Sequence, residues 1–91
     1  MESRELLEAL ADLAAEAGLS VRVLQGRAGG DDLATASSGV CRVREEVWVV
    51  LAEADPVEER IEVLARALRE HAAPLLEGRY LPPAVRARLG V

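Results

Sequence analysis

Residues 39–52, with the sequence GVCRVREEVWVVLA, contain the pattern that decides the fold. Residues 40–44 and 47–52 are rich in Val and predict two strands, and the short chain between them predicts that they are antiparallel neighbours. Glu45 and Glu46 are expected at the turn, although tight hairpin turns prefer Asn-Gly or Asp-Gly. The second strand is apolar on both faces, which is typical of a strand that is covered on both sides.

A long helix is predicted directly after this hairpin. Asp55, Pro56 and Glu58 have the spacing of a helix start, with Asp55 capping the first turn and Pro56 at the first helical position. Pro74 is expected to end the helix near Ala73. The residues that recur at helical spacing, and so predict the buried side, are Val57, Ile61, Leu64, Leu68 and Ala72.

The segments on either side complete the prediction. Residues 3–17 show helical spacing of apolar residues, and Gly18 follows them as a stop signal. Residues 19–25 alternate in polarity and predict a strand, and the stretch Gly26–Asp32 is interpreted as a surface loop. The sequence LPP at residues 81–83 is expected to open a short last helix.

Together these elements predict one α+β domain over residues 1–91. It consists of a helix, a three-stranded mostly antiparallel sheet that includes the hairpin, a long helix and a short C-terminal helix. The chain is 51% hydrophobic but contains no Phe, so the core is expected to consist of Leu, Val and Ala. A thin core of this kind favours burial of a further face in an oligomer.

Charge and composition argue against nucleic-acid and membrane binding. The net charge is −5 and only 2% of residues are aromatic, whereas nucleic acids attract clustered positive charge and aromatic platforms. Arg79, Arg86 and Arg88 are interpreted as a solvated helix face. The polar N-terminus and the absence of a long apolar run predict a cytoplasmic protein without membrane contact.

Cys41 and His71 are the only candidates for catalysis. A thiolate nucleophile needs a base, usually His, and both residues are expected to face the layer between sheet and helix. In the alternative interpretation Cys41 packs as a small apolar residue and His71 caps the end of its helix. Neither a metal nor a cofactor is expected, because one Cys and one His cannot supply the four ligands of a structural zinc site.

A hairpin followed by DPVEER at residues 55–60 and VLARALRE at residues 63–70 resembles the core of the small zinc peptidases of the ImmA/IrrE type. In that family the helix carries an HExxH run that binds zinc. Here Arg66, Ala67 and Glu70 stand at the positions of the first ligand, the general base and the second ligand. The resemblance therefore implies a metal-free relative of a hydrolase.

A second resemblance covers more of the chain. The sequences GVCRVR at residues 39–44, EER at residues 58–60 and YLPPAVR at residues 80–86 are similar to a family of short uncharacterised bacterial proteins. This resemblance implies a bacterial origin and a shared fold, and it implies no activity.

The function expected from the sequence is protein association without catalysis. Trp48 and Val50 share one face of the central apolar strand and are the candidate interface residues of a homodimer or of a complex with a protein partner. Two other coverings of Trp48 stay open, namely the loop of residues 26–38 and the arm from Leu75 to Leu81. The alternative functions are an enzyme that relies on Cys41 and His71, or a decayed hydrolase.

Overall fold

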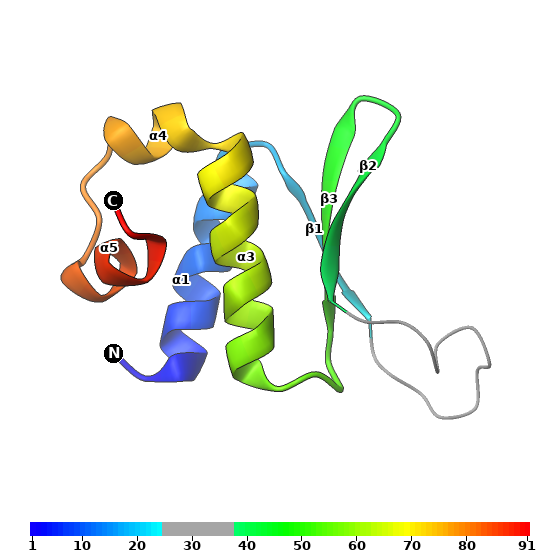
Figure 1. Ribbon diagram of the computed structural model, residues 1–91, viewed down its shortest axis with the longest axis horizontal. Helices are drawn as coiled ribbons and strands as arrows, with labels where there is room; N and C mark the ends of the chain where they lie inside the picture. Colours follow the sequence, from blue (N-terminus) through cyan, green and yellow to red (C-terminus); the bar gives the residue numbers. More distant parts are fainter. Residues whose placement is uncertain (25–37) are drawn as a thin grey trace.

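The described part of the chain comprises residues 1–24 and 38–91 of the computed structural model, and it forms a helical layer packed on one face of a three-stranded sheet (Figure 1). Helices α1 (Ser3–Glu16) and α3 (Val57–His71) lie side by side between the sheet and the C-terminal segment. The α+β prediction is confirmed.

The two long helices begin and end close to their predicted limits. Gly18 follows α1 with a φ of +88°, a left-handed conformation that glycine adopts without steric cost. Two short helices follow α3, namely α4 (Ala73–Glu77), which was not expected, and α5 (Pro83–Leu89), which was. Pro74 lies in the first turn of α4, where its missing N–H needs no partner. The proline that follows the end of α3 therefore also helps to start a new helix.

The sheet is mixed and has the order β1-β3-β2. Strand β2 (Gly39–Val43) pairs antiparallel with β3 (Glu46–Ala52), as predicted. Strand β1 (Ser20–Leu24) pairs parallel with β3, so the expectation of a mostly antiparallel sheet is corrected. The hairpin places β2 on one edge of β3, which leaves the other edge of this apolar central strand for β1.

The hairpin turn lies one residue earlier than expected. Val43 pairs with Glu46, so that Arg44 and Glu45 form a two-residue turn and Glu46 belongs to β3. Arg44 has a φ of +59°, the left-handed region that such turns require and that Gly or Asn usually supplies. The turn is therefore strained at Arg44 and contains only one of the two glutamates expected there.

The core lies between the two layers and is aliphatic, as the composition predicts. Its largest fully buried side chains are Leu10, Val49, Ile61, Leu64, Leu68, Leu81, Val85 and Leu89. The C-terminal segment supplies three of them, namely Val85 and Leu89 from α5 and Leu81 from the chain that precedes this helix. Helix α5 contacts both α1 and α3, and so the end of the chain belongs to the helical layer.

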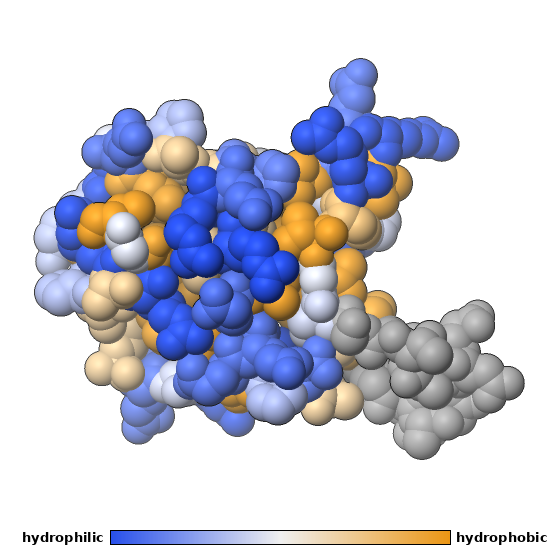
Figure 2. Space-filling view, viewed as in Figure 1, coloured by the Kyte–Doolittle hydropathy of each residue, from blue (hydrophilic) through white to orange (hydrophobic). Residues whose placement is uncertain are grey.

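The two faces of the sheet have different surroundings. We call the face that packs on α1 and α3 the inner face and the opposite one the outer face. The outer face carries Ser20, Arg22, Leu24, Gly39, Cys41, Val43, Glu46, Trp48, Val50 and the buried Ala52. Among the described residues, no helix lies on the outer face (Figure 1). Figure 2 shows hydrophobic residues of the hairpin beside the hydrophilic exposed side of α3.

Asp55 does not cap helix α3, and that prediction is wrong. The residue that precedes the helix is Pro56, and no side chain caps its first turn. The Asp55 carboxylate instead accepts a hydrogen bond from the backbone N–H of Ser38, at 2.8 Å, and the Ser38 hydroxyl accepts one from the N–H of Ala52, at 2.9 Å. Asp55 thus ties the start of β2 to the connection between β3 and α3.

The bond to Ser38 predicts an acid-sensitive contribution to stability. It holds the pKa of Asp55 below its ordinary value of 3.8. A lowered pKa in the folded state stabilises the fold above pH 3.8, and the contribution is lost as the pH falls through the folded-state pKa. The native chain should therefore be more stable than Asp55→Asn at neutral pH, with a difference that shrinks in acid. Urea unfolding of both proteins from neutral pH to below pH 3.8 measures the difference in the free energy of unfolding. A difference that is independent of pH would contradict the prediction.

Candidate functional site

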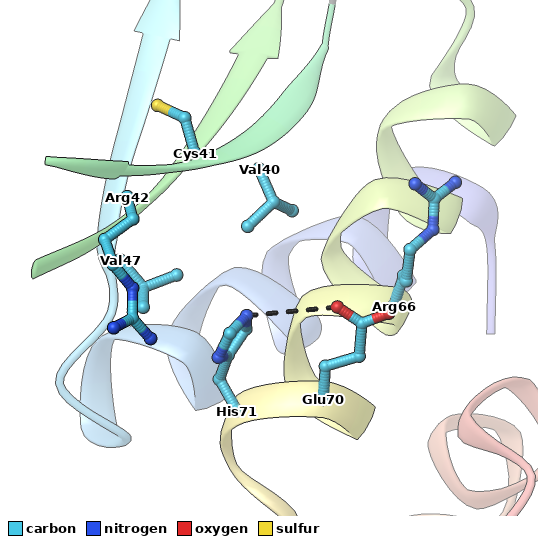
Figure 3. Close-up of a pocket in the computed structure, with 7 residues that line it drawn as sticks. All are labelled: Val40, Cys41, Arg42, Val47, Arg66, Glu70 and His71. Atoms are coloured by element: carbon cyan, nitrogen blue, oxygen red, sulfur yellow. Dashed lines mark ion pairs between the residues drawn. The ribbon is translucent and has the colours of Figure 1, made fainter.

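The inner face of the hairpin and the end of α3 border an open cavity of about 320 Å³ (Figure 3). It is lined by Val40, Cys41, Arg42, Val47, Arg66, Glu70 and His71. His71 is the last residue of α3, and its Nε2 atom lies 3.9 Å from Oε1 of Glu70. The polar groups on the cavity therefore come from Arg42 on β2 and from the C-terminal half of α3.

The structure does not bring the Cys41 thiol to His71. Successive side chains of a strand point to opposite faces, and Val40 points into the cavity. Figure 3 shows the sulfur of Cys41 directed away from the cavity, and Cys41 is exposed. Both earlier placements of Cys41, in the layer facing His71 and as a buried apolar residue, are therefore wrong. The thiol and the imidazole lie on opposite sides of the sheet.

The positions singled out by the resemblance to zinc peptidases also lie at this cavity. Arg66 and Glu70 line it, whereas Ala67 is fully buried. Within residues 1–24 and 38–91 no group of three or more His, Cys, Asp or Glu side chains is placed to hold a metal ion. Two of the three positions that the resemblance singles out thus line the cavity, and the described residues there do not form a set of metal ligands.

Trp48 and Val50 lie on the outer face and are both partly exposed. Trp48 has two polar partners from its own chain. The guanidinium carbon of Arg22 lies 4.4 Å from the centre of the indole ring, a cation–π distance, and the indole N–H donates to Glu46 Oε1 at 3.0 Å. A positive and a negative group thus flank a single indole on this face.

Arg22 and Glu46 are site residues that the sequence interpretation missed. Glu46 could have been found, because it lies two residues before Trp48 and alternation places both on one face. Arg22 could not, because it reaches Trp48 only through the parallel pairing of β1 with β3. Nothing in the local sequence signals that pairing.

The C-terminal arm does not cover Trp48. Leu76 and Leu81 are buried in the hydrophobic core, and α5 packs on α1 and α3. The other proposed covering, the loop of residues 26–38, lies outside the described residues except for Ser38, as does the predicted surface loop Gly26–Asp32. Among the described elements, the outer face is therefore the one large surface of the sheet without a packed helix (Figure 1).

Two of the three C-terminal arginines form ion pairs with helix residues. Arg79 pairs with Glu16 of α1. Arg88 lies 3.2 Å from Glu58 and 3.4 Å from Glu62, both on α3. The interpretation as a solvated helix face holds for Arg86 and Arg88, which lie on α5, and not for Arg79, which lies between α4 and α5.

No family model, curated protein or solved structure matches this chain. The resemblances to the ImmA/IrrE-type peptidases and to short bacterial proteins therefore stay predictions from sequence pattern. The helices within residues 1–24 and 38–91 are too short or too polar to cross a membrane.

Proposed function

We propose that this chain is a non-enzymatic association domain that binds another protein surface through the outer face of its sheet. The observation that carries the proposal is the position of Trp48. The single tryptophan of the chain lies on a face to which no described helix is docked, while aliphatic side chains fill the core. The proposed setting is the cytoplasm of a bacterium, as the sequence predicts.

The chemistry of the outer face supports association. Trp and Arg are enriched in protein interfaces, and together they supply much of the binding energy where they are buried on contact. Here Arg22 and Trp48 are stacked on each other, with Val50 and Val43 beside them on the same face. The alternative of a Cys41 enzyme has no comparable support, because its thiol lies on the opposite side of the sheet from His71.

Protection of Cys41 in cells tests the proposal. Cys41 is the only cysteine and lies on the outer face beside Trp48. A Tyr80→Cys variant adds a reference thiol at a position that is 80% exposed in the helical layer. We expect a small maleimide to label position 41 several-fold more slowly, relative to position 80, in expressing cells than in the dilute purified protein. Mass spectrometry measures both labels in one molecule, so reagent uptake cancels.

The proposal is wrong if the labelling rate of position 41 relative to position 80 is the same in cells and in dilute solution. Equal relative labelling of the two thiols in cells and in dilute solution would show that the outer face is unoccupied where the protein works. Slower labelling of both positions by the same factor would reflect reagent supply alone and would count as the same negative result.

A further inference from the structure

We infer that the surface bound by the outer face is a second copy of this chain, related by a twofold axis that runs across the strands along Ser20, Trp48 and Cys41. The inference rests on the association proposed above and names its partner. Strand register defines this row, because Ser20 on β1 and Cys41 on β2 are both direct partners of Trp48 on β3.

The symmetry determines which residues meet. A twofold axis in the plane of the contact keeps the row on itself and reverses the strand direction. Each residue of the row then faces its own copy, so that Trp48 meets Trp48 and Cys41 meets Cys41. One step along the outer face is two residues along a strand. A residue one step before the row on one copy faces the residue one step after it on the same strand of the other copy.

The charges on the outer face are complementary under this rotation. Glu46 lies one step before Trp48 on the outer face, and Arg22 lies one step after it, beside Val50. The rotation keeps each strand over its own copy, so Glu46 of one copy comes over Val50 of the other, and Arg22, the neighbour of Val50 on β1, lies diagonally across from that Glu46. This diagonal pair of Arg22 and Glu46 occurs twice. Each chain has a net charge of −5, so two copies repel each other at long range. Two pairs of opposite charge offset part of that repulsion at the contact.

Both charged groups are held in place by the indole between them. Arg22 stacks 4.4 Å from the ring centre, and Glu46 accepts the indole N–H at 3.0 Å. The two side chains therefore lose less conformational freedom on binding than free surface side chains do. This arrangement favours a partner that offers an acid and a base at the same spacing, as a second copy does.

The shape of the face is also complementary to itself. Val43 and Gly39 lie one step on either side of Cys41, and Val43 is 37% exposed. Gly39 leaves open space, since a Cβ atom built on it would meet nothing within 4 Å. The rotation places Val43 of each copy over Gly39 of the other. A protruding valine thus meets a gap twice, as side chains interdigitate between packed sheets.

The size of the face predicts a weak dimer. Three strands spaced about 4.8 Å apart, with a rise of about 3.3 Å per residue, give a face of roughly 15 Å by 20 Å. This is below the area of a standard stable interface. We therefore expect dissociation in the micromolar range and a mass that depends on concentration.

Charge reversal tests the pairing of Arg22 with Glu46. We expect Arg22→Glu alone and Glu46→Arg alone each to raise the dimer Kd at least tenfold, because each places two like-charge pairs in its homodimer. An equimolar mixture of the two variants should recover the dimer, since both pairs of the mixed complex are then opposite in charge. Sedimentation equilibrium from micromolar to millimolar concentration measures this. Arg42→Glu, a reversal on the same sheet but on the inner side, is the matched control and should leave the Kd unchanged.

Cross-linking of Cys41 tests the position of the axis. The only thiol of the chain lies on the proposed axis, so that a short bis-maleimide should join two native chains. The cross-link should be lost in Arg22→Glu and in Glu46→Arg and should return in their mixture. A native dimer without the cross-link, or a mixture that does not recover, would overturn the proposed axis.

These results separate the failure of the inference from that of the proposed function. A native chain that is monomeric up to millimolar concentration overturns the second copy as the partner. If Cys41 is nevertheless protected in cells, a different protein occupies the outer face and the association function stands. If Cys41 is not protected there, both proposals are wrong.

Discussion

The substitution Val49→Asp should abolish folding of the isolated chain. Val49 is 0% exposed at the centre of the sheet, on the face that packs on the helices. A carboxyl group there loses its hydration and gains no partner, which costs about 5 kcal/mol or more. A small domain with a thin core has a total stability near the lower end of the usual range, about 5 kcal/mol. Far-UV circular dichroism at low micromolar concentration should therefore show a largely unfolded chain.

The neighbouring Val50→Asp is the matched control, because it makes the same change on the other face. Val50 is partly exposed and pairs with Arg22, which would lie beside the new carboxylate. We expect a cost of about 1 kcal/mol or less to the fold of one chain, the range of strand propensities. Association through the outer face should be lost. An equal loss of folding in both variants would contradict the assignment of the two faces.

The substitution Leu89→Ala should lower the free energy of unfolding by about 3 kcal/mol. Leu89 is fully buried in α5, where it packs in the core with the helical layer. Truncation leaves a cavity that a thin aliphatic core fills poorly, and the midpoint of thermal unfolding should fall by roughly 10–20 °C. Thermal unfolding followed by circular dichroism measures the change.

Val91→Ala, two residues further on, is the control for Leu89→Ala. Val91 is 50% exposed, so its truncation should change stability by less than about 0.5 kcal/mol. A Leu89→Ala variant as stable as the native chain would show that the C-terminal segment is not docked on α1 and α3. The arm would then be free to reach the outer face, and the association proposal would lose its main support.

Local signals in the sequence predicted most of the fold. Residues 39–52 specified a hairpin because they combine two valine-rich runs with almost no chain between them. Gly18 marked the end of α1, and helical spacing marked α3. The parallel pairing of β1 with β3 was not predictable in this way. Its partners Ser20 and Trp48 are far apart in sequence, and strand direction is decided by the path of the chain between them.

The candidate site was predictable only in part. Trp48 was recognised, because an indole on a two-faced apolar strand needs a covering. The face of Cys41 was not decided by alternation, since β2 carries Val40 on one face and Val43 on the other. Asp55 was assigned as the cap of the helix that follows it. In the fold its carboxylate accepts a hydrogen bond from the N–H of Ser38 and not from the first turn of α3. Such long-range hydrogen bonds leave no pattern in a single sequence.

The side chains of strand β3 alternate between the core and the outer face of the sheet. Val47, Val49 and Leu51 serve the core, while Glu46, Trp48 and Val50 form the outer face. Inserting or deleting a single residue in this strand would exchange the two sets, burying the glutamate and indole and exposing the core valines. A change of one residue in the length of this strand is therefore more damaging than the substitution of any one residue of the outer face. The outer-face residues can be exchanged one at a time without changing the core, whereas a change in strand length alters both faces at once.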